Sequence, residues 1–185
     1  MDGGDATLSP VKRARREKIM DAAQSLFLTR GLRGTTVEGI AETVGMSKVT
    51  IYSYFNDKDA IFAAVVARFF NQMREAFYSA ISQPGRPAER IARALIVKQG
   101  AVYDLVRLSP FAEELLAEGK SVGTHLADLD VDVTLVIADI LSDADTARVI
   151  LHSSLGILEH ANSRAEFEDD LRRVVHTMCS GVRRA

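Results

Sequence analysis

The sequence predicts an all-α protein. Its apolar residues recur every three to four positions, as in helices that bury one face, and no stretch alternates convincingly with period two as a half-buried strand would. Only 4 prolines occur in 185 residues and tryptophan is absent, which suits a mostly helical chain. Because 47% of the residues are hydrophobic, we expect a packed core rather than global disorder.

The first helix is expected to begin at Lys12, after a disordered leader over residues 1–11 whose first nine positions are rich in Gly, Asp, Ser and Thr. Gly31 should end this helix. Its predicted buried stripe consists of Ile19, Ala22, Ala23, Leu26 and Phe27, which fall at i, i+3, i+4, i+7 and i+8.

The second helix is short and has two alternative starts. Thr35 with Glu38 three residues later forms a capping-box pattern, and Thr36 is the alternative cap. Gly45 should end the helix. Its apolar stripe is Val37, Ile40, Ala41 and Val44.

A third short helix should follow Ser47 as its cap, and Asn56 or Asp57 should cap a long fourth helix that ends at "QPGRP", residues 83–87. About nine helices are therefore expected in total. The remaining ones are predicted over about 88–106, 110–118, 121–142, 145–163 and 165–183.

Composition narrows the class of protein. A single cysteine, Cys179, excludes an internal disulfide framework and is typical of a reducing compartment. No apolar run reaches the roughly 18 residues of a membrane span, and no apolar segment follows the basic N-terminal patch as in a signal peptide. We therefore expect a soluble, cytoplasmic protein without a membrane partner.

No chemistry-bearing pattern indicates an enzyme. The chain has no Ser/His/Asp arrangement, no Gly-rich phosphate loop and no recognisable carboxylate pair. No His/Cys/Asp/Glu spacing predicts a metal site, and no cofactor is expected. His125 and His152 are isolated, so structural hydrogen bonding is the simpler role for each.

Charge is distributed unevenly along the chain. The net charge is −2, but residues 12–18, "KRARREK", carry a local charge of +4, whereas residues 61–185 hold 14 Lys/Arg and 17 Asp/Glu. A basic run is often only a solvated face, so this feature by itself is a weak indication of an anionic partner.

Two short amphipathic helices joined at Gly45 and packed on a longer helix form a helix-turn-helix pattern. In the third helix Ile51 and Phe55 share one face and should be buried. The remaining side chains should point outward, and they are of the types that contact phosphates and base edges in DNA. Proteins that never touch DNA also contain such helix pairs, so periodicity alone leaves both interpretations open. The outward set is Lys48, Val49, Thr50, Tyr52, Ser53 and Tyr54.

At these residues the sequence resembles the TetR family of bacterial transcription regulators. The resemblance covers "AAQSLFLTRGLRGTTVEGIAETVGMSKVTIYSYFNDKDAIFAAVV", residues 22–66, about the first third of the chain. Val49 stands where the family often has glycine or alanine, which bears on base preference. The resemblance implies an N-terminal helix-turn-helix DNA-binding domain over residues 12–58 and a helical effector-binding and dimerisation domain over 59–185.

The resemblance also implies roles for individual residues. Lys48, Val49 and Thr50 would face the major groove, and Tyr52 and Tyr54 would meet the backbone. Ser47 and Ser53 are further DNA-binding candidates. Phosphates would be contacted by Thr36 and Lys58, and by Lys12 and Arg13 unless these two lie in a solvated tail. The partner would be a double-stranded, pseudo-palindromic operator, with release by a small, mostly apolar effector. The alternative is an activator or helical interaction protein without an effector.

The C-terminal helices carry apolar stripes that predict either a homodimer interface or closure of the chain's own core. The interface candidates are Ile150, Ser154, Leu155, Leu158, Leu171, Val175 and Met178, with small residues Ser153 and Gly156 allowing close approach. Candidate walls of an effector pocket are Phe69, Phe70, Phe77, Val102, Tyr103, Leu105, Phe111, Leu115 and His125. For each of them ordinary core packing is the simpler role, and only a cavity would change that.

Overall fold

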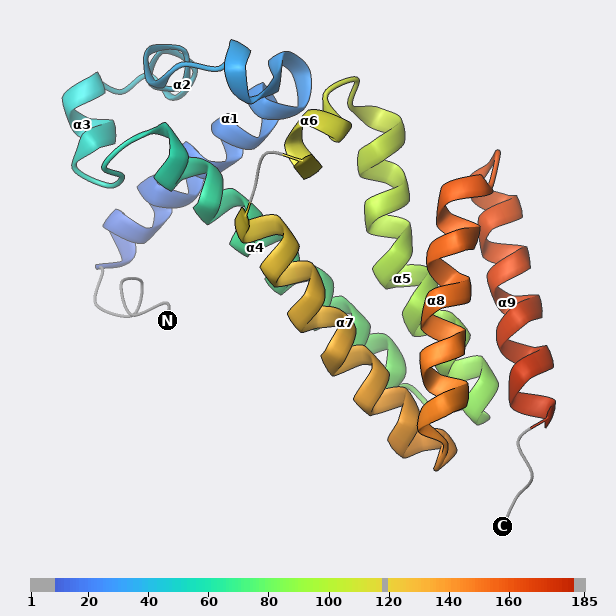
Figure 1. The fold of residues 1–185 in the computed structure, drawn as a ribbon. Helices are drawn as coiled ribbons and strands as arrows, with labels where there is room; N and C mark the ends of the chain where they lie inside the picture. Colours follow the sequence, from blue (N-terminus) through green and yellow to red (C-terminus); the bar gives the residue numbers. More distant parts are fainter. Residues whose placement is uncertain (1–8, 118–119, 182–185) are drawn as a thin grey trace. The chain divides into compact units, whose positions relative to one another are not determined.

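The computed structural model describes residues 9–117 and 120–181, and these residues form nine α-helices and no strand (Figure 1). The predicted all-α class is therefore confirmed. The helices are α1 (Pro10–Gly34), α2 (Val37–Val44), α3 (Lys48–Tyr52), α4 (Lys58–Ile81), α5 (Pro87–Leu108), α6 (Ala112–Ala117), α7 (Lys120–Leu141), α8 (Ala144–His160) and α9 (Arg164–Gly181).

Helix α1 begins two residues before the predicted start. Ser9 caps it, since its hydroxyl accepts a hydrogen bond from the N–H of Lys12 at 3.4 Å, and Pro10 occupies the first helical position, where its missing N–H costs nothing. The predicted leader over 1–11 is thus wrong at its last two residues, and residues 1–8 lie outside the described part. The stripe of Ile19, Ala23 and Phe27 is buried as predicted.

A break at Gly31 ends the regular part of α1. Gly31 has φ 72°, a conformation that favours glycine, and the freed carbonyl accepts a hydrogen bond from the buried Thr35 hydroxyl at 2.7 Å. The Thr35–Glu38 capping box is therefore wrong, because the Thr35 hydroxyl faces back toward α1. The alternative is correct: the Thr36 hydroxyl accepts from the N–H of Gly39 at 3.1 Å and caps α2.

The described chain divides into two compact units. The head unit holds the described residues of 1–68 and 108–122, and the bundle unit holds those of 69–107 and 123–185. The head unit therefore extends beyond the predicted division at residue 58. It includes Arg68 of α4, whose guanidinium donates to Glu17 (2.9 Å), Asp21 (2.7 Å) and Gln24 (2.7 Å) of α1.

Helix α6 also belongs to the head unit, because it packs on α1 near the Gly31 break. The Ser109 hydroxyl donates to the carbonyl of Leu28 at 2.8 Å, and the N–H of Arg33 donates to the Glu114 carboxylate at 3.2 Å. These contacts satisfy backbone groups that the end of a helix leaves without internal partners.

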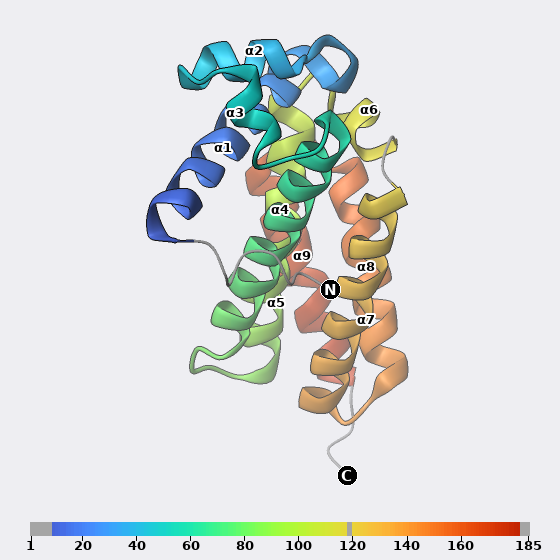
Figure 2. The same cartoon turned by 90° about the vertical axis from the view of Figure 1, so that its left-hand side faces the viewer.

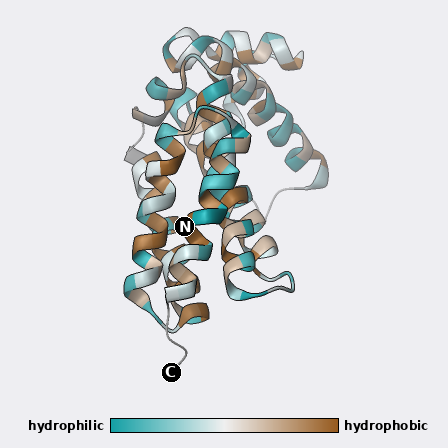
Figure 3. Cartoon of the chain, turned by 90° about the vertical axis from the view of Figure 1, so that its right-hand side faces the viewer, coloured by the Kyte–Doolittle hydropathy of each residue, from teal (hydrophilic) through white to brown (hydrophobic). Residues whose placement is uncertain are grey.

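The bundle unit consists of the rest of α4 with α5, α7, α8 and α9. Each of its helices carries both hydrophobic and hydrophilic residues (Figure 3). Helices α8 and α9 pack side by side (Figure 1). The polar contacts of this unit include two made by buried side chains: Lys98 of α5 pairs with Asp130 of α7 at 2.7 Å, and Gln99 donates to Ser154 of α8 at 2.8 Å. Fully buried apolar side chains include Phe77, Leu95, Leu129, Ile137, Ile150 and Phe167.

Candidate nucleic-acid interface

Helices α2 and α3 form a tight helix-turn-helix (Figure 2). Gly45 ends α2 in the left-handed conformation, φ 66°, and its N–H bonds to the carbonyls of Ala41 and Glu42. Ser47 then caps α3 as predicted, since its hydroxyl accepts from the N–H of Thr50 at 3.1 Å. The turn between the two helices therefore consists of three residues, 45–47.

The inward face of α3 is as predicted. Ile51 is completely buried, and Phe55, just after the helix, is also buried. The guanidinium of Arg16 lies 5.0 Å from the centroid of the Phe55 ring, so a basic residue of α1 covers the buried Phe55 side chain. With Ile51 and Phe55 held inside, the opposite flank of α3 faces solvent.

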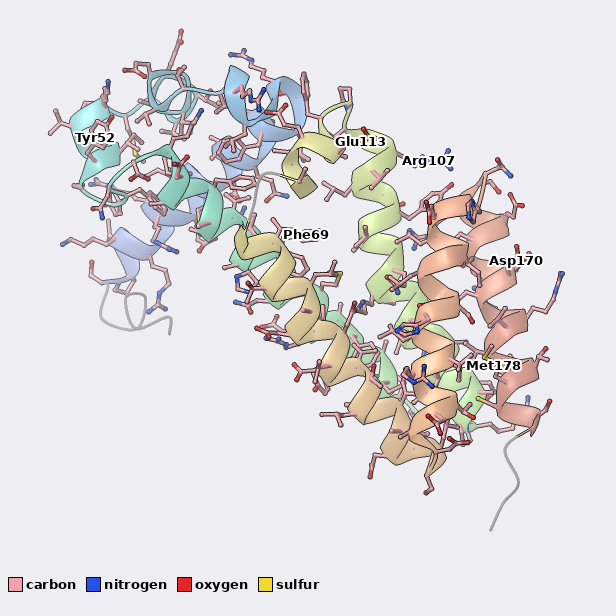
Figure 4. All side chains as sticks on the ribbon, viewed as in Figure 1. Tyr52, Phe69, Arg107, Glu113, Asp170 and Met178 are labelled. Carbon is pink, nitrogen blue, oxygen red and sulfur yellow. The ribbon has the colours of Figure 1, made fainter. Side chains whose placement is uncertain are left out.

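That outer flank carries Val49, Tyr52 and Ser53. Val49 is 79% exposed and Tyr52 is 44% exposed; Tyr52 is labelled on α3 in Figure 4. Thr50 and Tyr54 are half-buried, so Tyr54, which follows the end of α3, is less exposed than predicted. The Thr50 and Ser47 hydroxyls lie 2.8 Å apart in a hydrogen bond, which fixes both at the start of α3.

An acidic residue lies on the same surface. The ammonium of Lys48 pairs with the carboxylate of Glu38 on α2 and lies 5.7 Å from the centroid of the Tyr52 ring. The hydrogen bond from Lys48 lowers the pKa of Glu38, and the same bond raises the pKa of Lys48. Sequence reasoning missed this role, because it assigned Glu38 to a capping box.

Lys58 has a different environment from the one expected. Its ammonium donates to the carbonyls of Leu32 at 2.6 Å and Thr35 at 3.1 Å, which bind it to the end of α1. An ammonium has three donors, so one N–H at most remains for the predicted phosphate contact. Thr36 is exposed at the start of α2, and its capping role uses the hydroxyl as an acceptor, which leaves its O–H to donate.

Lys12 and Arg13 lie in the first turns of α1 and are exposed. The interpretation that placed them in a solvated tail is therefore wrong, because Ser9 and Pro10 start the helix before them. Their contact with DNA stays a prediction.

Comparison with known proteins agrees with this geometry. Residues 19–65 match the sequence model of a protein family described as "Bacterial regulatory proteins, tetR family". The crystal structure of a TetR-like transcriptional regulator from Rhodococcus sp. RHA1 superposes with a TM-score of 0.69 at 26% identity, covering 91% of this chain and 98% of that one. Residues 19–65 therefore match the TetR family, and the fold over most of the chain is that of a TetR-like regulator.

Two relatives of this chain are transcriptional regulators. HTH-type transcriptional regulator BetI of Brucella anthropi is 31% identical over 111 residues, which are 60% of this chain and 54% of BetI, so the match spans about half the length of that relative. HTH-type transcriptional repressor KstR2 of Mycolicibacterium smegmatis is 23% identical over 147 residues, 65% of this chain and 72% of KstR2. The protein is accordingly a DNA-binding regulator of transcription, and its relatives are regulators rather than enzymes.

Among the residues predicted to line a TetR-type effector pocket, Phe70 contacts both Phe69 and His125, whereas Tyr103 stacks on a different ring. Phe77 is fully buried, Phe70 stacks on His125 with centroids 5.6 Å apart, and Tyr103 stacks on Phe167 at 5.5 Å. Phe69 meets Phe70 edge-on, and Val102 and Leu105 are half-buried.

Phe111 and Leu115 differ from the other pocket candidates because they belong to the head unit. A hollow of about 1100 Å³ in the bundle unit lies between the starts of α5 and α8 and the ends of α7 and α9, and none of the predicted wall residues lines it. The pocket assignment therefore stays a prediction, with core packing as the observed role of Phe77 and Phe70.

The predicted interface residues separate into two groups. Ile150, Ser154, Leu171 and Val175 are completely buried within the chain itself, and Ser154 is bonded to Gln99. These four close the chain's own core, so their assignment to a dimer surface is wrong. The physical reason is that the α8–α9 pair uses its most apolar stripe to pack internally. Leu155, Leu158 and Met178 are half-buried and stay candidates; Met178 is labelled on α9 in Figure 4.

The described residues contain no group of three or more His, Cys, Asp or Glu side chains placed to bind a metal ion. Among their helices, none combines the length and the apolar content needed to cross a bilayer.

Proposed function

We propose that the protein is a homodimeric repressor that binds a pseudo-palindromic operator and is released from it by a small, mostly apolar molecule. One observation carries the DNA-binding part of this proposal. Ile51 and Phe55 are buried, and this leaves Val49 and Tyr52 exposed beside the capped start of α3. A short helix anchored on one side and polar on the other is suited to the major groove.

The half-buried apolar residues of α8 and α9 support a dimer. Leu155, Leu158 and Met178 keep part of their surface accessible. On a different face of α8, Ser153 and Gly156 line a hollow of about 360 Å³ together with the half-buried Ile157. Small residues on a helix surface allow a second pair of helices to approach closely. Dimerisation has a function here, since two recognition helices must be roughly 34–36 Å apart to enter successive major grooves.

Release by an effector requires the ligand to bind one conformation of the dimer better than another. A coupling free energy of about 1–3 kcal/mol is enough to lower operator affinity by roughly 5- to 150-fold. Helix α4 contributes residues to both compact units, so it is one continuous element through which such coupling would pass. The repressor KstR2 among the relatives supports repression over activation.

The decisive experiment selects a duplex from a randomised library with the wild-type protein and measures binding by gel shift and anisotropy. Tyr52→Phe should weaken binding to all duplexes together, because it removes a hydroxyl available to phosphate. Thr50→Ala should relax base preference at the positions it faces. Tyr78→Phe is the matched control, since Tyr78 is also exposed, at 40%, but lies in the bundle unit.

Undiminished affinity and unchanged base preference in both head variants would refute the assignment of α3 as the recognition helix. Light scattering of the free protein tests the dimer directly, and a monomeric mass at the concentrations used for binding would remove the homodimer from the proposal.

A further inference from the structure

A carboxylate stands on the surface that is proposed to meet a polyanion. Glu38, on α2, has a side chain that is 61% exposed, and it pairs with Lys48, whose side chain is 47% exposed, at the start of α3. Phosphates repel a carboxylate, so this acid opposes binding to DNA of any sequence. Its presence at this position therefore calls for a physical reason.

Stability does not supply that reason. The packing of α2 on α3 depends on the fully buried Ile40 and Ile51 and on the turn at Gly45. An ion pair as exposed as this one contributes little to folding. Thr36 already caps α2, and the favourable interaction of an acid with the first turn of a helix is small and independent of Lys48.

The effect of Glu38 on Lys48 is more specific. A lysine without a fixed partner is a mobile point charge that binds any phosphate in reach. Here the ammonium is held between the carboxylate of Glu38 and the ring of Tyr52, whose centroid is 5.7 Å away. The carboxylate opposes the attraction of the ammonium for phosphates and holds it near the N-terminal end of α3, where side chains reach base edges.

We propose that Glu38 is a specificity-determining residue of the DNA interface, which positions Lys48 for a base edge and lowers affinity for DNA of unrelated sequence. The partner of Lys48 in the groove would be an acceptor pair such as O6 and N7 of guanine, which a lysine reads best. This inference rests on the proposed DNA-binding function and adds a second requirement to it, namely discrimination between sequences.

The test compares Glu38→Gln with Glu42→Gln. Glu42 is exposed one turn further along α2, so both variants lose one carboxylate from the same helix. The probes are the duplex selected by the wild-type protein and a scrambled duplex of the same composition, both fluorescein-labelled and titrated by anisotropy over a series of salt concentrations.

Glu38→Gln should bind the scrambled duplex more tightly and steepen the salt dependence by about 0.9 in log–log slope, as one additional phosphate contact does. The ratio of affinities for the selected and scrambled duplexes should fall about fivefold or more, the lower range of one good base contact. Glu42→Gln should change both affinities by a similar factor and leave the ratio as in the wild type.

A Lys48→Gln background separates positioning from simple repulsion. If Glu38 acts through Lys48, adding Glu38→Gln to Lys48→Gln leaves the affinity ratio where Lys48→Gln alone places it. The inference is overturned if Glu38→Gln matches Glu42→Gln, or if its effect on the ratio persists without Lys48. A wild-type protein that selects no sequence would instead overturn the proposed function itself.

Discussion

Replacing Asp130 by asparagine should lower the free energy of unfolding of the bundle unit by about 3–5 kcal/mol, the usual cost of leaving a buried charge without its partner. The side chain of Lys98 is 1% exposed, and its ammonium lies 2.7 Å from the Asp130 carboxylate. Asparagine keeps the shape of the aspartate but removes its charge. The buried ammonium then has neither a counterion nor water around it.

The reverse substitution should cost less. In Lys98→Met the buried charge itself disappears, and the methionine fills much of the volume of the lysine stem. The carboxylate that remains is 22% exposed and can be solvated. The double variant Lys98→Met/Asp130→Asn should therefore be more stable than Asp130→Asn alone, since replacing a whole buried pair by uncharged groups is often close to neutral.

Urea denaturation followed by circular dichroism measures these differences, with the slope of free energy against urea checked for each variant. Asp132→Asn is the matched control. Asp132 lies two residues further along α7 and pairs with Arg74 at 3.2 Å, but the two side chains are 41% and 38% exposed, so less than about 1 kcal/mol should be lost. Equal losses for Asp130→Asn and Asp132→Asn, or a larger loss for Lys98→Met than for Asp130→Asn, would refute the reasoning.

Three further predictions concern single positions. Ile51→Ala should destabilise the head unit by about 2–5 kcal/mol, because the side chain is completely buried, whereas Val49→Ala should leave its melting temperature unchanged; equal melting of the two variants would contradict the orientation of α3. Gly31→Ala should lower the free energy of unfolding by about 1–3 kcal/mol, because φ is 72° and a Cβ would lie 2.6 Å from a Glu114 carboxylate oxygen. Calorimetry measures this loss, and a loss no larger than that of an alanine substitution at an exposed helical position would contradict the break in α1 at Gly31. Hydrogen bonds from Thr146 lower the pKa of Asp143. The contribution of Asp143 to stability is therefore full above the ordinary pKa of an aspartate and is lost as the pH falls through the pKa of Asp143 in the folded protein. Asp143→Asn should flatten the acid-unfolding curve over this pH range, and an unchanged curve would exclude the effect.

The sequence predicted the helices and the orientation of α3 because both depend on local patterns. Ile51 and Phe55 are the apolar residues of a short polar segment, so a single helical turn determines which side is buried. Gly31 and Gly45 were identified correctly because each occupies a left-handed position at the end of a helix, where glycine is favoured.

Contacts between distant segments could not be predicted in the same way. The choice of Thr36 over Thr35 as the cap depended on the carbonyl that the break at Gly31 leaves free. The ammonium of Lys58 is bound by two such carbonyls, and no local pattern indicates that.

Periodicity also leaves open which partner an apolar stripe meets. Leu171 and Val175 follow the same helical period as a surface stripe would, and only the packing of α9 on α8 shows that they are internal. The pairing of Glu38 with Lys48 joins two helices across a turn, and the charge pattern of either helix alone gives no sign of it.

The attachment of α6 to the end of α1 limits how freely the head unit can be transferred from one regulator to another. A chimaera joined at residue 58 would discard Ser109 and Glu114, and the carbonyl of Leu28 and the N–H of Arg33 would lose the groups that bind them. A transplantable module would have to carry residues 109–117 along with the first 68, even though residues 69–107 of the bundle separate the two in the chain.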